Sequence, residues 1–230
     1  GLIVSTVPAV TAAVFTSNKI KAAPVRVAID RLQQSGGMVR ALIANSGNAN
    51  ACTGAEGIDT VRSVCRELSG VLNLDERQVL MSSTGIIGVP LPLEKVTASL
   101  PRLVGDLAPG GLDDFAQAIM TTDTVPKLIM KTVPLAGAEV SLCGIAKGAG
   151  MIMPRMATML SFILTDAAVD PAFLGSAFRG AVADSFNSIT IDGDTSTNDM
   201  ALILANGVAG NPPLTGVSTG ADVFMDSLCG

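Results

Sequence analysis

The sequence has 230 residues, of which 48% are hydrophobic and 15% charged, and a net charge of −5, so it is long and apolar enough to fold around a substantial core. Its 15 Lys and Arg residues form no basic stripe, and it has neither Trp nor Tyr for base stacking, so we expect no nucleic-acid partner. It contains no His, which excludes Ser-His-Asp and Cys-His catalysis and leaves zinc only thiolates and carboxylates, so we predict no metal site.

The first third of the chain alternates apolar runs with polar turns. Residues 1–18 are uncharged and predict two buried strands, one on each side of Pro8. A membrane span is not expected there, because a basic lead-in is missing and proline, serine and threonine interrupt the run. Residues 41–54 predict a strand that runs into a loop rich in Asn and Gly. Apolar residues at three- and four-residue steps predict an amphipathic helix at 55–72.

The middle of the chain carries shorter apolar runs that are separated by turn residues. The strand at 78–88 is expected to end in a Thr-Gly turn, and Pro101 is expected to interrupt the first helix that follows. The predicted elements, in order, are a strand at 78–88, helices at 93–104 and 112–121, and strands at 127–133 and 139–145.

The last third is predicted to hold a strand that starts at Thr158 and a helix at 171–185. Residues 187–199 predict a strand that feeds a polar loop, and residues 200–207 form a further buried element. Strands and helices mix without a steady βαβ alternation, so we predict an α/β or α+β fold. We expect a layered helix/sheet sandwich in which all 230 residues form one unit.

A chain without His can still use a hydroxyl nucleophile when the nucleophile's own α-amino group acts as the base, after cleavage before that residue. The α-amino pKa of about 7.7–8.0 suits this role. Thr158 fits because the small residue Ala157 precedes it, a Gly- and Pro-rich stretch lies upstream and an apolar run lies downstream. The plain alternative is a β-branched residue that favours the end of a strand.

Two other polar positions could assist such a nucleophile. Thr84 and Gly85 follow a predicted strand, where a hydroxyl and a backbone N–H could stabilise an oxyanion, although an ordinary Thr-Gly turn has the same sequence. Lys147 could bind a substrate carboxylate, and its alternative is a solvated turn lysine. The stretch KGAG also resembles a phosphate cradle, but neither GxxxxGK[ST] nor GxGxxG is present.

The stretch ITIDGDTST raises a hypothesis of another class. An apolar run followed by Asp192 and Asp194 resembles the nucleophile loop of haloacid-dehalogenase-type phosphatases. Those enzymes also need a downstream lysine and an acidic pair, and after Asp194 the chain has no Lys, no Arg and no adjacent carboxylates. An EF-hand loop is excluded as well, because Thr197 stands where the turn glycine should be.

Five stretches, taken together and in this order, resemble the bifunctional ornithine acetyltransferase/glutamate N-acetyltransferase family of arginine biosynthesis: ANSGNANACTG, SSTGIIG, AIMTTDT, IAKGAGMIMPRMATML and DGDTSTND. The resemblance covers essentially the whole chain. It implies self-cleavage between Ala157 and Thr158, which would leave residues 1–157 as an α-chain-like segment and 158–230 as the start of a β-chain-like segment. The freed Thr158 would be the catalytic nucleophile.

The resemblance also implies a reaction and a set of site residues. The acetyl group of N2-acetylornithine would pass through an acetyl-threonine intermediate to glutamate, giving ornithine and N-acetylglutamate. Thr84 and Gly85 would form the oxyanion hole. Lys147 and Thr122 would bind substrate together with the nucleophile, Thr121 being the alternative to Thr122. No cofactor is implied, although some family members accept acetyl-CoA as a donor.

Partners and compartment follow from the same resemblance. Family members form a heterotetramer of two cut α and two cut β chains, and we expect no membrane partner. Four cysteines without CxxC spacing and the lack of a visible signal favour the cytoplasm. Family members extend further at both ends, so we expect this chain to be part of a longer protein. A related self-processing amidase or peptidase, or an inactive fragment, remain as alternatives.

Overall fold

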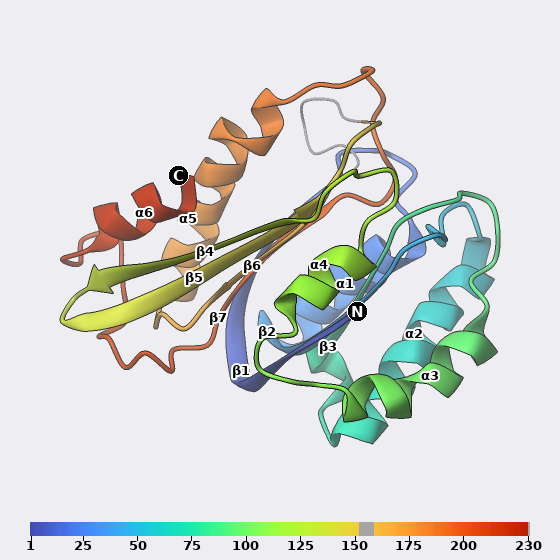
Figure 1. Ribbon diagram of the computed structural model, residues 1–230, viewed down its shortest axis with the longest axis horizontal. Coiled ribbons are helices and arrows are strands. Elements are labelled where there is room, and N and C mark those ends of the chain that lie inside the picture. The colour runs from blue at the N-terminus through green and yellow to red at the C-terminus, as the bar shows by residue number, and fades with distance from the viewer. Residues whose placement is uncertain (152–158, 230) are drawn as a thin grey trace.

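The computed structural model describes residues 1–151 and 159–229, so the predicted cleavage site at Ala157 and Thr158 lies outside the described residues. Seven strands form one mixed sheet in the order β3-β2-β1-β7-β6-β5-β4, and helices pack around it (Figure 1). This arrangement confirms the predicted layered α/β class. The strands are β1 Leu2–Phe15, β2 Met38–Asn45, β3 Val79–Ser83, β4 Lys127–Leu135, β5 Ala138–Lys147, β6 Leu160–Thr165 and β7 Met200–Ala205.

Six α-helices are described, together with two short 3-10 turns, η1 Glu76–Gln78 and η2 Phe186–Ser188. Within the described residues, no helix is long and apolar enough to cross a membrane. The α-helices are α1 Ala23–Gln34, α2 Gly54–Leu72, α3 Leu93–Gly105, α4 Leu112–Ala118, α5 Pro171–Asp184 and α6 Ala221–Cys229.

The central strand β7 is buried on both of its faces. It pairs antiparallel with β1 and parallel with β6. Its even-numbered residues from 200 to 204 join a core with α1 and α4, and its odd-numbered residues from 201 to 205 join a second core with α5 and α6. Burial on both faces explains why this stretch is apolar throughout instead of alternating.

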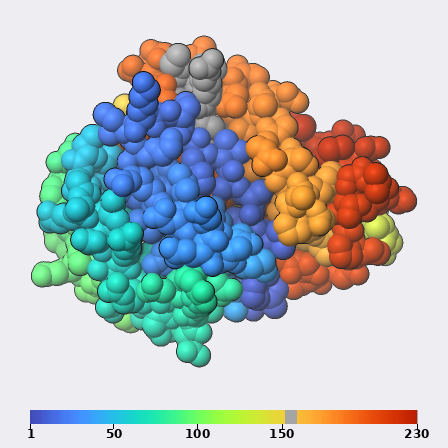
Figure 2. All heavy atoms as spheres, turned by 180° about the vertical axis from the view of Figure 1, so that it is seen from behind, coloured from blue at the N-terminus to red at the C-terminus, as the bar shows by residue number. Residues whose placement is uncertain are grey.

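A third core lies between the helix pair α2 and α3 and the β2–β3 end of the sheet. Figure 1 shows this helix pair at the opposite end of the molecule from α5 and α6. Seen from behind in Figure 2, the blue N-terminal region lies between the cyan α2 region and the orange α5 region. Segments far apart in the sequence therefore lie on either side of the N-terminal region in this view.

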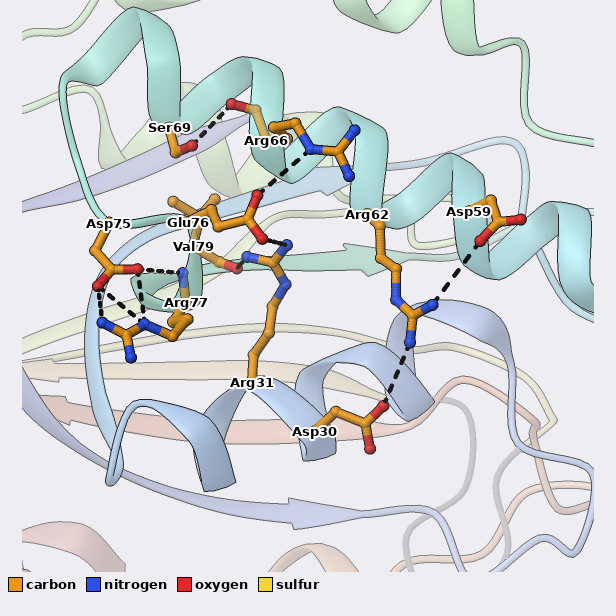
Figure 3. Close-up of polar contacts among 10 residues, drawn as sticks. All are labelled: Asp30, Arg31, Asp59, Arg62, Arg66, Ser69, Asp75, Glu76, Arg77 and Val79. Carbon is orange, nitrogen blue, oxygen red and sulfur yellow. Dashed lines mark hydrogen bonds and ion pairs between the residues drawn. The ribbon is translucent and has the colours of Figure 1, made fainter.

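A buried arginine connects α1 to the start of β3. The Arg31 guanidinium donates to the carbonyl oxygen of Val79 over 3.3 Å and lies 3.9 Å from a Glu76 carboxylate oxygen (Figure 3). Its side chain is only 6% exposed, whereas the Arg77–Asp75 pair in the same view is open to water. Since water screens exposed pairs, we expect the Arg31 contacts to contribute more to stability than the Arg77–Asp75 pair does.

Two predictions about prolines are wrong. Pro8 does not separate two strands, because β1 runs from Leu2 to Phe15 and shifts its register against β2 between Val4 and Ala9. This irregularity accommodates a residue that has no N–H for the ladder. Pro101 does not interrupt its helix either, since α3 continues through it to Gly105.

The strand predicted at the start of 187–199 is also absent from the described structure. The segment forms the short turn η2 and then no regular strand, with isolated bridge positions at Ile191 and Asp192. Ile189 and Ile191, whose alternation suggested a strand, are both exposed. No partner strand among the described elements covers them, so their β-propensity is not realised as a regular strand.

Candidate active site

A cavity of about 310 Å³ lies where the ends of β3 and β5 meet the loop that precedes β7. Thr84, Gly85, Lys147 and Thr122 all line it, together with Thr121. The structure therefore brings the described residues of the predicted site to one place, although they come from three separate segments. The predicted nucleophile lies outside the described residues.

Parallel pairing of β2 and β3 sets the Thr84–Gly85 turn beside the Asn-rich loop. Asn45 and Ser83 are register partners at the ends of these strands. The Thr84 N–H donates to the Asn45 carbonyl oxygen over 3.1 Å, and the Ser83 hydroxyl donates to the Asn45 side-chain oxygen over 2.6 Å. The Ala49 N–H then donates to the Ile86 carbonyl over 2.9 Å. The two loops are thus joined along their length.

Gly85 suits its position in this turn for two reasons. Its φ of +134° lies in a region that side-chain-bearing residues seldom adopt. A Cβ atom built there would lie 2.2 Å from the carbonyl carbon of Gly47 and 2.4 Å from the Asn48 nitrogen, which are both backbone atoms. The Gly85 N–H has no acceptor among the residues that the structure describes, so it is available as a donor.

The Lys147 ammonium group links two threonines of the cavity. Its Nζ donates to the Thr84 hydroxyl oxygen over 2.9 Å and to the Thr121 hydroxyl oxygen over 3.0 Å. An ammonium group can only donate, so each hydroxyl accepts and keeps its own proton for another partner. The Thr84 hydroxyl can therefore donate to a group bound in the cavity. Thr122 lines the same cavity and is exposed.

Electrostatics around Lys147 act in opposite directions. Burial lowers the pKa of Lys147, the carboxylates of Asp123 and Asp199 oppose this shift, and the result is a lowered pKa. Burial alone would raise the pKa of Asp123, but hydrogen bonds from Lys127 and from the Gly148 N–H, with the two lysine charges, lower it overall. Asp123 therefore stays ionised near neutral pH and supplies negative charge behind Lys147.

The start of β6 is fixed close to this cluster. The Met159 N–H donates to a carboxylate oxygen of Asp199 over 2.9 Å, and Leu160 pairs directly with Lys147. Met159 follows the predicted nucleophile Thr158 in the sequence. Met159, which follows Thr158 in the chain, thus directly precedes the strand that runs beside Lys147.

Sequence reasoning missed two residues of this site. Asp123 is buried behind Lys147, and Asn198 lines the cavity. Both lie in stretches that carried the family resemblance, TTDT and DGDTSTND. The available signal was a polar residue within such a stretch, but only the pairing of the strands shows that these residues are buried. Over the part of the chain that is described, no group of three or more Cys, Asp or Glu residues is arranged to hold a metal ion.

Comparison with protein families gives a match to the ArgJ family over residues 1–229. The arginine biosynthesis bifunctional protein ArgJ of Geobacter sulfurreducens is 53% identical over 223 residues. These residues make up 97% of this chain and 56% of that protein. The chain therefore spans about half the length of the curated relatives that it matches.

Two solved structures resemble the chain in both fold and sequence. The crystal structure of arginine biosynthesis bifunctional protein ArgJ from Bacillus halodurans has a TM-score of 0.62 and 38% identity, over 69% of this chain and 81% of that one. The ornithine acetyltransferase of Mycobacterium tuberculosis, complexed with ornithine, has a TM-score of 0.56 and 32% identity. The match covers 69% of this chain and 82% of that one.

Proposed function

The chain belongs to the ArgJ family, and we propose that it is part of a glutamate N-acetyltransferase that moves an acetyl group from N2-acetylornithine to glutamate. One observation carries this proposal: a buried lysine donates to the Thr84 hydroxyl beside the Gly85 N–H at the wall of a cavity. A cation and two hydrogen-bond donors at one cavity suit a substrate that has a carboxylate and an acyl group that becomes an oxyanion. The related M. tuberculosis enzyme has ornithine bound.

In the proposed reaction, Thr158 is freed by cleavage of the Ala157–Thr158 bond. Its Oγ attacks the acetyl carbonyl carbon while its α-amino group takes the hydroxyl proton. The tetrahedral oxyanion accepts hydrogen bonds from the Thr84 hydroxyl and the Gly85 N–H. When it collapses, the C–N bond breaks, the ornithine nitrogen takes the proton, and an acetyl ester remains on Thr158.

The second half of the reaction reverses these steps. The amine of glutamate attacks the acetyl ester, the same donors stabilise the second oxyanion, and Thr158 leaves with its proton restored. N-Acetylglutamate is the product. One oxyanion donor is worth about 2.7–4 kcal/mol of transition-state stabilisation. Lys147 would bind a substrate carboxylate, with Thr122 or Thr121 beside it, and its burial strengthens that attraction.

Other parts of the proposal rest on the family alone. Acetyl-CoA would be a second donor, and the assembly would contain two cut α and two cut β chains in the cytoplasm. A self-processing amidase or peptidase, and an inactive fragment, are the competing functions. The products distinguish all three: a transferase gives acetylglutamate, a hydrolase gives free acetate or amino acids, and an inactive chain gives neither.

The test uses the full-length parent protein and the Thr84→Ala variant. We expect acetylglutamate from the wild type, and a kcat about 10²–10³-fold lower for the variant, because one oxyanion donor is lost. Thr132→Ala, at an exposed threonine of β4, serves as the control and should keep wild-type kcat. Free acetate as the main wild-type product would support the hydrolase, and an unchanged kcat would remove Thr84 from the oxyanion hole.

A further inference from the structure

The loop before β7 carries a buried asparagine that links three segments at the cavity. The Asn198 side-chain nitrogen donates to the Ala49 carbonyl over 2.6 Å and to the Ser83 carbonyl over 2.9 Å. Its side-chain oxygen accepts from the Thr197 hydroxyl over 2.6 Å. Because carbonyl oxygens can only accept, they determine which way the amide points. Asn198 is 7% exposed, so these bonds are sheltered from competing water.

These two carbonyls belong to the loops that form the turn at Thr84 and Gly85. The Ser83 carbonyl is part of the same peptide plane as the Thr84 N–H, so the bond from Asn198 orients the peptide that leads into the turn. Ala49 lies in the loop that holds Ile86 on the far side of the turn: the Ala49 N–H donates to the Ile86 carbonyl, and the Gly47 carbonyl accepts from the Ile86 N–H. The Asn198 side chain therefore holds both the residue before the turn, Ser83, and the loop beside the turn, at Ala49.

We propose that Asn198 is a positioning residue for the proposed oxyanion site. It holds the Ser83 and Ala49 carbonyls so that the Thr84 hydroxyl and the Gly85 N–H face the cavity. Both amide protons of Asn198 are bound to the backbone, so it acts through the turn rather than by donating to substrate. The catalytic consequence of this inference rests on the proposed function, whereas the effect on the turn does not.

The loop that carries Asn198 is itself anchored. The Asn198 N–H donates to the Ser196 hydroxyl over 3.0 Å, and the Ser196 carbonyl accepts from the Thr16 hydroxyl over 2.7 Å. The Ala22 N–H donates to the Thr197 carbonyl over 2.9 Å. These contacts fix the loop to the segment after β1. These bonds hold the loop in place, so Asn198 can hold the Thr84–Gly85 turn in a defined position.

The neighbouring residue extends the same loop to the other side of the cavity. Asp199 accepts from the Met159 N–H at the start of β6, while Asn198 holds Ser83 at the end of β3. Two adjacent residues therefore set the spacing between the turn and the strand that follows the predicted nucleophile. Loss of Asn198 should disturb this spacing without removing any group that touches substrate.

The test compares Asn198 with Asn211 in the full-length parent. Asn211 is also buried, donates to the Ala168 and Pro212 carbonyls over 3.0 and 2.8 Å, and accepts from the Ala168 N–H over 2.9 Å. It does not line the cavity. Asn198→Asp keeps the size but turns a carboxylate toward two carbonyls, and Asn198→Ser is a milder second variant. Asn211→Asp and Asn211→Ser are the matched controls.

We expect each Asn198 variant to lower the melting temperature about as much as the matching Asn211 variant does. Only the Asn198 variants should lower kcat, by about 10- to 100-fold, because the donors are misplaced rather than deleted. KM should change much less, since no substrate contact is removed. Equal losses of kcat in both series, or an unchanged kcat in the Asn198 series, would overturn the inference.

Amide hydrogen exchange tests the effect on the turn without relying on catalysis. Residues 83–88 and 45–51 should exchange faster in the Asn198 variants and at the wild-type rate in the Asn211 variants. Unchanged exchange in the Asn198 series contradicts the positioning role. If the wild-type parent transfers no acetyl group, the proposed function fails, and the exchange result still decides whether Asn198 holds the turn.

Discussion

Lys147 shows how a single residue combines burial with charge. Its ammonium is almost fully enclosed, yet it has two hydroxyl acceptors and two carboxylates nearby. The enclosure lowers its pKa, and the carboxylates of Asp123 and Asp199 limit that change. Such a lysine loses its proton at a lower pH than a solvated lysine does.

This lowered pKa predicts a change in substrate binding at alkaline pH. As pH rises through the lowered pKa of Lys147, the cation is lost and the KM for N2-acetylornithine should rise at a pH below the ordinary lysine value of 10.5. Between the lowered pKa of folded Lys147 and 10.5, the unfolded chain binds more protons than the folded one. The contribution of Lys147 to the free energy of unfolding therefore increases with pH in this range. KM measured against pH tests the prediction.

Lys147→Arg is the matching variant, because a guanidinium keeps its charge throughout this range. Its KM should be higher than that of the wild type but flat with pH, since the planar group fits the two hydroxyls less well. A wild-type KM that stays constant until pH reaches 10.5 would contradict the predicted role of burial.

Gly85 offers a second residue-scale prediction. Gly85→Ala should destabilise the protein and abolish acetyl transfer, because the new Cβ would meet the backbone of Gly47 and Asn48. Gly88→Ala is the matched control: its φ is also positive, at +83°, but nothing lies within 4 Å of its Cβ position. The control should lose only about 1–2 kcal/mol. If urea denaturation gives the same loss in free energy of unfolding for both variants, the close approach of Gly85 to Gly47 and Asn48 does not matter.

At the scale of elements, Arg31 is a buried polar contact that joins α1 to the start of β3. Arg31→Met should lower the free energy of unfolding by about 1.5–3 kcal/mol, because the Val79 carbonyl loses a charged donor in a buried place. Arg77→Ala, at an exposed pair, should leave it unchanged within error. Urea denaturation of both variants tests this prediction. Similar losses in the free energy of unfolding would contradict the distinction between the buried and the exposed arginine.

Periodicity predicted elements well where a single face of the element is buried. The helix expected at 55–72 is α2, and the one expected at 171–185 is α5. Helix α1 was not predicted, although the sequence carries the signal: Val25, Ala28, Ile29 and Leu32 recur at three- and four-residue steps and pack in one core.

At the scale of the whole molecule, the site depends on strand order, which local patterns do not contain. Strand β1 near the N-terminus pairs with β7, almost two hundred residues later. That pairing brings the loop before β7 to the ends of β3 and β5 and so creates the cavity. Residue types and the family resemblance could identify Thr84, Gly85 and Lys147 as candidates. Only the sheet order places Asn198 beside them.

The central claim is that Thr158 carries the acetyl group after cleavage of the chain before it. The most direct measurement is intact-mass spectrometry of the full-length parent, incubated with N2-acetylornithine and then with glutamate. We predict two fragments that meet at Ala157–Thr158, the later one heavier by one acetyl group until glutamate is added, and a single unmodified chain for Thr158→Ala. An uncut wild-type chain that still transfers acetyl, or an acetyl group on the earlier fragment, would contradict the account.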